Sequence, residues 1–157
     1  MDPEKDAQII AHLRNDGRTS LTAISKKTGL PVSTIFDRIK GNSAITRYSA
    51  LLNFRELGFG CRAIVLLRTT KDKKNELGQH LQRNPYVNSL HKINNGMDYL
   101  LEGVFKDLGH IEQFIESIEE RYTIRTKEVH YLLEEMKREG FMTDAASAYS
   151  VSQGKTH

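Results

Sequence analysis

Residues 61–69, Cys-Arg-Ala-Ile-Val-Leu-Leu-Arg-Thr, contain the longest uninterrupted apolar run of the chain. Glycines at positions 58 and 60 precede this run, and the charged residues 71–74 follow it. A short aliphatic and β-branched run between turn formers and charges is typical of a buried β-strand. The sequence therefore predicts a strand over residues 61–69.

The residues that follow predict further elements in regular order. Residues 75–83 have leucines at helical spacing and end before Asn84-Pro85, which predicts a helix. Strands are predicted at 87–93 and 99–105, and the turn 94–96 separates them. The amphipathic pattern of 108–122 predicts a helix capped by Asp107, and 124–133 predicts a fourth strand. The order β-α-β-β-α-β is that of a ferredoxin-like domain, here placed at residues 58–140.

Three short helices are predicted before this domain. Asp2-Pro3 is a typical helix start, and Asn15-Asp16-Gly17 ends that helix. The next two helices meet at Thr28-Gly29-Leu30, a tight turn containing glycine. This arrangement predicts a helix-turn-helix, of the winged kind, over residues 1–44. The fold class is therefore α+β, with a linker strand at 45–57 and a mobile Ser-, Ala- and Thr-rich tail at 141–157.

The charge of the chain is unevenly distributed. Residues 1–48 hold eight Lys and Arg against five Asp and Glu, so they carry the whole net charge of +3. A segregated basic segment indicates a polyanion such as double-stranded DNA as partner. In the third predicted helix, 31–40, Ile35 and Ile39 define the buried face. The opposite face then holds polar, aromatic and basic side chains suited to bases and phosphates.

Several motifs together resemble the leucine-responsive (Lrp/AsnC, feast–famine) family of transcription regulators. In the helical part they are Arg18-Thr19-Ser20, Ile24-Ser25, Thr28-Gly29-Leu30, Ser33-Thr34-Ile35 and Arg38-Ile39-Lys40. Downstream they are 45–50, which resembles the family's linker strand, then 84–87, and finally 94–101 beside the family's effector site. The predicted DNA-binding residues are Arg18, Thr19, Ser33, Thr34, Phe36, Asp37, Arg38, Lys40 and Arg47. The predicted effector-binding residues are Asn94, Asn95, Gly96, Met97, Asp98 and Tyr99.

The resemblance implies a prokaryotic, cytoplasmic, sequence-specific regulator. It implies a dimer built from the C-terminal domains, in some members assembled into tetramers or octamers. It also implies a small-molecule effector, usually an amino acid, bound between subunits. Asp98 stands before a predicted strand, where it would either bind an effector ammonium or cap a loop.

The chain departs from the family pattern in three places. The spacing from Ile39 to Ile45 is about three residues shorter than usual, which shortens the recognition helix, and Ala44 would fill part of the space left. Pro31 replaces a capping serine, and the loop glycine falls one position late, at Gly96, with Asn95 in its place. Asparagine tolerates positive φ, so that turn is expected to survive. The shortened helix leaves open an alternative: a ligand sensor or hetero-oligomer partner with impaired DNA binding.

Little in the sequence supports a metalloprotein, a membrane protein or an enzyme. None of the six histidines has a cysteine or acid at metal-ligand spacing, so neither a metal nor a cofactor is expected. The single Cys61 lies in a predicted strand, where a buried small side chain is expected. No apolar stretch is long enough to cross a membrane, and the polar N-terminus does not resemble a signal peptide. A remote enzyme alternative is a siroheme-decarboxylase-like protein, a family with the same two-part architecture. Only His91 and Lys92 flank the segment where that family is rich in His, Arg and Tyr.

Overall fold

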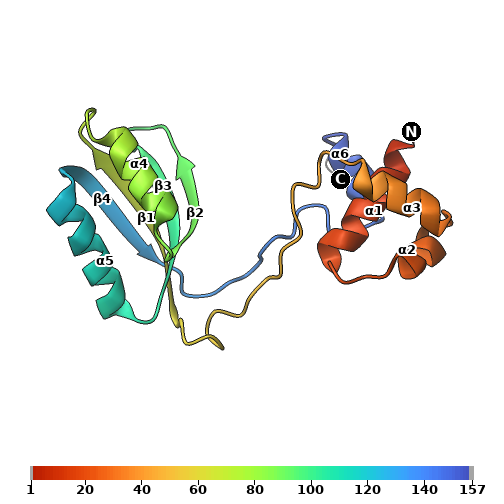
Figure 1. Cartoon of the computed structure of the whole chain (residues 1–157), viewed down its shortest axis with the longest axis horizontal. Helices are drawn as coiled ribbons and strands as arrows, with labels where there is room; N and C mark the ends of the chain where they lie inside the picture. The colour runs from red at the N-terminus through yellow and green to blue at the C-terminus, as the bar shows by residue number, and fades with distance from the viewer. Residues whose placement is uncertain (1, 156–157) are drawn as a thin grey trace. The chain divides into compact units, whose positions relative to one another are not determined.

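The computed structural model describes residues 2–155 and divides the chain into two compact units (Figure 1). The helical unit comprises Met1–Leu51 and Met136–His157, and the sheet unit comprises Leu52–Glu135. Met1, Thr156 and His157 lie outside the described residues. The chain therefore leaves the helical unit once and returns to it after the sheet unit is complete.

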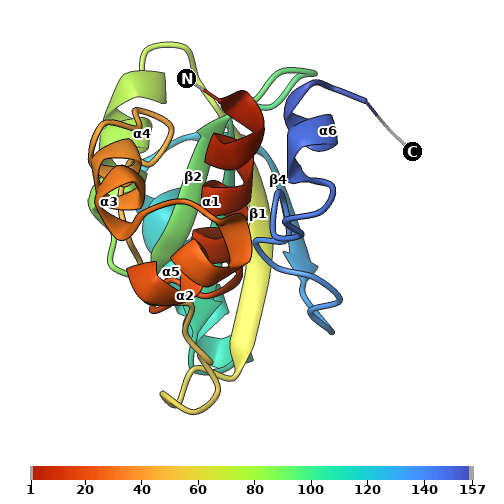
Figure 2. The same cartoon turned by 90° about the vertical axis from the view of Figure 1, so that its right-hand side faces the viewer.

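The helical unit contains α1 (Pro3–Asn15), α2 (Leu21–Thr28), α3 (Val32–Lys40) and the short α6 (Ala148–Ser152). Asp2 caps α1 by accepting hydrogen bonds from the amides of Glu4 and Lys5. Ile9, Ile24 and Ile35, one from each of the first three helices, form a core that is at most 2% exposed. In Figure 2, α1 lies between α3 and the C-terminal segment that carries α6. The described residues of this unit contain no strand, so the expected wing is not present.

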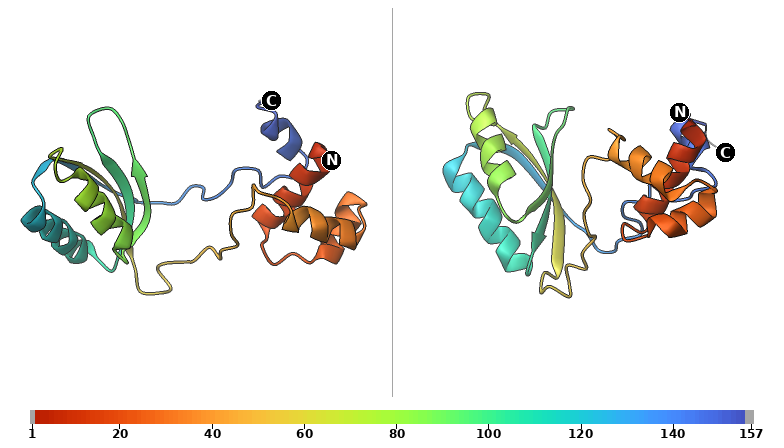
Figure 3. Two further views of the ribbon diagram at one scale, coloured as in Figure 1. Left: turned by 45° about the horizontal axis from the view of Figure 1, so that its top comes forward. Right: turned by 45° about the vertical axis from the view of Figure 1, so that its right-hand side comes forward.

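The sheet unit confirms the predicted βαββαβ order. It consists of β1 (Cys61–Thr69), α4 (Lys74–Arg83), β2 (Val87–Lys92), β3 (Tyr99–Phe105), α5 (Leu108–Arg121) and β4 (Ile124–Tyr131). The strands form one antiparallel sheet in the order β2-β3-β1-β4. Both α4 and α5 cover the same face of this sheet (Figure 3). The opposite face carries no helix of the sheet unit.

The core of the sheet unit lies between the sheet and its two helices. Alternate residues of β1 point into it, because successive side chains of a strand point to opposite faces. Ala63, Val65 and Leu67 are fully buried there, against Leu77 of α4 and Ile111 of α5. Cys61 is partly buried and packs against this cluster, as expected for a small apolar side chain.

The predicted linker strand at 45–57 does not form. Residues 45–53 have no regular secondary structure, and 54–58 form turns. A strand needs a neighbouring strand to complete its hydrogen-bond ladder. Among the residues that the structure describes, the sheet consists of β1 to β4 alone. Leu51 and Leu57 therefore remain 60% and 57% exposed.

The predicted mobile tail is also different in the structure. Residues 141–155 form turns and α6, and Ala148 is fully buried in a cluster with Ala7 and Ala11 of α1. Composition suggested mobility because Ser, Ala and Thr bury little apolar area. Here the buried contact is made by alanines on both sides, so small side chains are what the close packing requires.

Candidate DNA interface and effector segment

The turn between α2 and α3 is fixed by local hydrogen bonds. Ser20 Oγ accepts from the Ala23 amide at 3.1 Å and caps α2. Gly29 ends α2 with φ +73°, a left-handed conformation that glycine adopts without steric cost. Ser25 Oγ then donates to the Leu30 carbonyl oxygen at 2.6 Å. Because Pro31 provides no side-chain cap, as expected, the start of α3 is positioned by this turn.

The outer face of α3 exposes most of the side chains predicted to contact DNA. Ser33, Phe36, Asp37 and Lys40 are exposed, and Thr34 is half-buried. Phe36 is 53% exposed, so its ring is accessible to an apolar contact such as a thymine methyl group. Ile35 on the opposite face is fully buried, so the helix is fixed in its rotation.

Arg38 occupies a different position from its predicted neighbours. One of its guanidinium nitrogens lies 2.8 Å from an Asp6 carboxylate oxygen and 3.2 Å from the Asp2 carbonyl oxygen. The Arg38 and Asp6 side chains are only 19% and 21% exposed. Arg38 therefore ties α3 to the N-terminal end of α1, and binding a phosphate would require it to leave this ion pair.

The remaining predicted DNA contacts lie outside α3. Arg18 is exposed and Thr19 half-buried in the α1–α2 turn, where the Asp16 carboxylate accepts from the Arg18 amide at 2.9 Å. Arg47 is exposed in the segment after α3. Lys5, for which no structural role was predicted, donates from Nζ to the Thr28 carbonyl oxygen at 2.7 Å and stabilises the end of α2. That bond joins residues 23 positions apart, so no local pattern could reveal it.

A cavity of about 350 Å³ lies at the C-terminal end of α3. Its lining is mostly apolar and consists of Leu21, Phe36, Ile39, Lys40, Asn42, Ile45 and Tyr48. Ala44 was expected to fill part of the space left by the shortened recognition helix, but it is exposed and does not line this cavity.

The six predicted effector residues lie in the β2–β3 connection and the start of β3, but they differ in surroundings. Asn95 and Gly96 have φ of +60° and +85°, so the asparagine does adopt the left-handed conformation expected of it. Both residues are exposed, as is Asn94, and Met97 is half-buried. Tyr99 is 2% exposed, and its hydroxyl donates to the Lys74 carbonyl oxygen at 2.9 Å. Tyr99 is thus part of the core and supports the start of α4.

Asp98 is engaged within the sheet unit. One carboxylate oxygen accepts from the Thr69 amide at 2.9 Å, and the other lies 2.6 Å from Lys74 Nζ. Burial alone would raise the pKa of this carboxyl. The hydrogen bonds from Lys74 and Thr69, with the charges of Lys74 and Arg68, outweigh burial and hold the pKa of Asp98 below its usual value. Asp98 is therefore ionised at neutral pH and joins the end of β1 to the start of α4.

Residues 2–155 contain neither a cluster suited to a metal ion nor a helix able to cross a membrane. No group of three or more His, Cys, Asp or Glu side chains within this range is arranged to hold a metal ion. No helix in the same range has the length and apolar character needed to cross a membrane.

Comparison with known proteins agrees with this two-unit architecture. The family model of the AsnC-type helix-turn-helix domain matches residues 3–41, and that of the Lrp/AsnC ligand-binding domain matches residues 62–141. The chain belongs to the Lrp/AsnC family of transcription regulators. The first match ends at Gly41, directly after α3, and the second runs from the second residue of β1 to beyond the end of β4.

Individual Lrp/AsnC proteins are similar over most of the chain. The transcriptional regulator FL11 of Pyrococcus horikoshii is 29% identical over 73% of this chain and 78% of its own length. FL11 of Pyrococcus furiosus is also 29% identical, over 80% and 89%. Among solved structures, the Neisseria meningitidis regulator NMB0573 in complex with L-Met covers 85% of this chain and 91% of its own. It has a TM-score of 0.77 at 23% identity, so this likeness concerns the fold. Bacillus subtilis LrpC has the same TM-score at 20% identity, covering 85% and 95%.

Proposed function

We propose that this regulator binds specific DNA sites through the exposed face of α3. The observation that carries the proposal is the outward presentation of Ser33, Phe36, Asp37 and Lys40 on a helix whose inner face is locked in the core. In a helix-turn-helix the second helix enters the major groove and its N-terminal residues reach base edges. Ser33, Thr34, Phe36 and Asp37 would supply base preference. Lys40, Arg18 and Arg47 would bind phosphates, with Thr19 at the α1–α2 turn.

Fluorescence anisotropy with duplex DNA from the protein's own upstream region tests this function. The control duplex has the same composition in scrambled order, and both are titrated at several salt concentrations. A specific regulator binds the native duplex more tightly, and its affinity falls steeply with salt because counterions are released. Equal, weak binding to both duplexes would favour a second candidate function, that of a sensor or partner subunit with impaired DNA binding.

The second candidate is a family-like sensor or hetero-oligomer partner with impaired DNA binding. Two observations favour it: α3 ends at Lys40, and Arg38 is held by Asp6. Both reduce the basic surface available to a DNA backbone. The relatives are named as transcription regulators, so we propose no enzymatic activity. The site of action would be the cytoplasm of a prokaryotic cell.

We also propose that the open face of the sheet forms a dimer interface. Ile64 and Leu66 of β1 and Leu100 of β3 lie on strand positions opposite the buried ones, and no helix of the sheet unit covers them. Arg62 and Glu102, paired at 2.7 Å, flank these apolar residues on the same face. Two such sheets stacked face to face would bury the apolar residues in a β-sandwich. Tetramers or octamers would require further surfaces.

A small-molecule effector, of which an amino acid is one class, would bind at the 94–99 segment of the dimer. The L-Met complex of the Neisseria meningitidis regulator motivates this assignment. The exposed Asn94, Asn95 and Gly96 would contact it directly, together with Met97. Asp98 is bound to Lys74 and Thr69, and Tyr99 is in the core, so these two would shape the site rather than contact the ligand. Isothermal titration with the twenty amino acids tests this site, and loss of all binding in an Asn94→Asp variant with an unchanged fold would support it.

A further inference from the structure

The C-terminal segment, residues 136–155, packs against α1 of the helical unit. Ala7 and Ala11 stand one turn apart on α1 and form a cluster with Ala148, with Met142 and Ala145 packed against it. Ala11 and Ala148 are fully buried. Small side chains on both sides let the two backbones approach closely, so this contact is built for one partner of matching shape.

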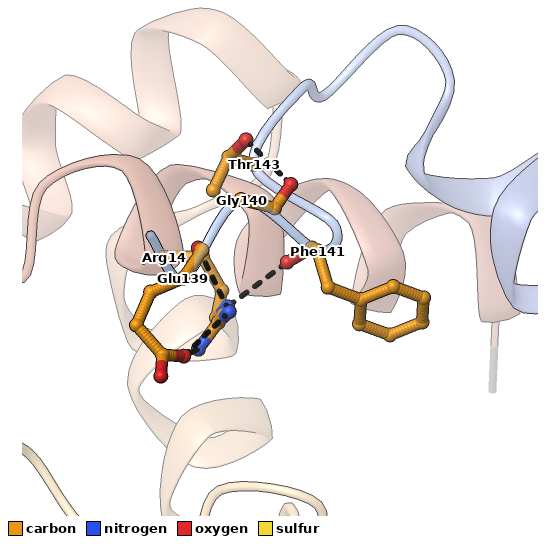
Figure 4. Close-up of polar contacts among 5 residues, drawn as sticks. All are labelled: Arg14, Glu139, Gly140, Phe141 and Thr143. Atoms are coloured by element: carbon orange, nitrogen blue, oxygen red, sulfur yellow. Dashed lines mark hydrogen bonds and ion pairs between the residues drawn. The ribbon is translucent and has the colours of Figure 1, made fainter. Parts of the chain in front are cut away.

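Arg14 provides the polar part of the same contact (Figure 4). Its Nε donates to the Phe141 carbonyl oxygen at 3.0 Å, and Nη2 donates to the Glu139 carbonyl oxygen at 2.9 Å. Both terminal nitrogens also bind the Glu139 carboxylate, at 3.1 and 3.2 Å. A guanidinium has five donors in a rigid fork, which suits it to holding several acceptors in one geometry.

The backbone that Arg14 holds is an unusual turn. Glu139 and Met142 have φ of +53° and +55°, a left-handed conformation that residues with a side chain rarely adopt. Thr143 Oγ1 donates to the Gly140 carbonyl oxygen at 3.1 Å and closes the turn. Such a backbone conformation persists only where neighbouring groups stabilise it. In this turn Arg14 does so through its hydrogen bonds to the Glu139 and Phe141 carbonyl oxygens.

The other side of α1 supports the recognition helix. Ile9 packs with Ile24 and Ile35, and Asp6 holds Arg38 of α3. One helix therefore contacts both the C-terminal segment and α3. The chain reaches the sheet unit after Leu51 and returns from it after Glu135, so the sheet unit is joined to α1 by a second stretch of chain.

We propose that the C-terminal segment is a regulatory clasp of the DNA-binding unit. When docked, it holds α1, and through α1 it holds α3 in the orientation that binds DNA. When it undocks, DNA affinity falls. The second connection lets a change at the effector domain act on α1 without passing through the linker at 41–60. The DNA part of this inference rests on the proposed function, whereas the docking part does not.

The test of docking is a thermodynamic cycle on the full chain without DNA. The variants are Arg14→Ala, a chain that ends at Lys137, and the two combined, with Asn15→Ala in the same helical turn as control. Hydrogen exchange at the α1 amides is measured in each. We expect each change alone to speed exchange about tenfold, equivalent to about 1.4 kcal/mol. The combination should be no faster than truncation alone, because Arg14 then has nothing left to hold. Additive effects, or unchanged exchange in the truncated chain, would overturn the clasp.

If the truncated chain fails to fold, a second variant still tests whether the C-terminal segment docks on α1. Ala148→Glu places a carboxylate in the buried alanine contact while Arg14 and Glu139 stay in place. We expect the same loss of α1 protection and roughly tenfold weaker DNA binding by anisotropy. Loss of protection with unchanged DNA affinity would refute the regulatory role and leave only a structural one. If the wild-type protein bound no duplex, the proposed function would fail, and the exchange cycle would still decide whether the segment docks.

Discussion

Two charged residues show how strongly the role of a side chain depends on its contacts. The sequence predicts a phosphate contact for Arg38, and for Asp98 either an effector ammonium or the capping of a loop. In the structure each is committed within its own unit, Arg38 to Asp6 and Asp98 to Lys74 and Thr69. Lys40, two positions after Arg38, is exposed. Residue type and spacing do not distinguish these cases, because the partners come from distant parts of the chain.

Arg38 and Lys40 should therefore respond differently to substitution. Arg38→Ala is expected to lower the free energy of unfolding by about 1 kcal/mol, since it breaks a partly buried ion pair. It should change the salt dependence of DNA binding little. Lys40→Ala should leave stability unchanged and reduce the slope of log affinity against log salt by about one unit. Urea denaturation and salt-titrated anisotropy measure the two effects. A one-unit loss of slope in Arg38→Ala, with unchanged stability, would mean that DNA draws Arg38 away from Asp6.

Asp98→Ala should destabilise the sheet unit. The change removes the acceptor of the Thr69 amide and the partner of Lys74, at an expected cost of about 2 kcal/mol. Asp98→Asn keeps an oxygen acceptor and is expected to lose less. Chemical denaturation monitored by far-ultraviolet circular dichroism compares the two variants. Wild-type stability in Asp98→Ala, combined with loss of effector binding, would instead assign Asp98 to direct ligand contact.

In helix α4, packing against the sheet outweighs intrinsic helix propensity at one position. Gly78 lies within α4, where alanine is normally the better helix former by about 1 kcal/mol. A Cβ at position 78, however, would overlap the hydroxyl of the buried Tyr99 and lie 2.8 Å from its Cζ. The glycine is needed because β3 places Tyr99 directly beneath the helix.

Gly78→Ala is accordingly expected to destabilise the protein by about 1–3 kcal/mol despite the helix propensity of alanine. Gly109→Ala in α5 is the matched control, because its Cβ would meet only Asp107 Oδ1 at 3.4 Å. Thermal denaturation should give a lower melting temperature for the first variant and an equal or higher one for the second. Equal melting temperatures would show that Tyr99 moves aside at little cost.

Helix α1 should make the helical unit sensitive to acid. Burial, and to a smaller degree the charge of Lys27, lowers the pKa of His12 from its ordinary value of 6.5. Between the folded and unfolded pKa values the unfolded chain binds more protons, so stability rises with pH there. The contribution is fully present above about pH 6.5 and is lost as the pH falls toward the folded pKa. His12→Gln, which is neutral throughout, should flatten this part of the stability–pH curve. An unchanged curve would show that other groups, such as His80 with its similarly lowered pKa, dominate.

At the scale of the whole molecule, the sheet unit leaves one face without a helix. The dimer proposed for this face would account for Ile64, Leu66 and Leu100 at positions that otherwise meet solvent. Small units of this size gain from association, because a short chain buries a smaller share of its surface.

If the proposed dimer forms through this face, Leu66→Lys should leave the protein monomeric, since it places a charge at the centre of the proposed interface. Gln113→Lys adds the same charge to the exposed surface of α5 and serves as control. Size-exclusion chromatography with light scattering measures the mass of each. A dimer that survives Leu66→Lys would place the interface on another surface.

The order of the elements and the nature of the two units follow from local sequence patterns. Apolar periodicity is local, so the bounds of β1 and β3 and the cap at Asp107 could be predicted within a residue. The exposed face of α3 followed from Ile35 and Ile39 for the same reason. Three outcomes follow only from the folded chain: which charges are paired, that 45–57 forms no strand, and that the C-terminal segment packs on α1. The contacts involved join residues 32 positions apart for Arg38 and Asp6 and 125 positions apart for Arg14 and Glu139, and no local pattern encodes them.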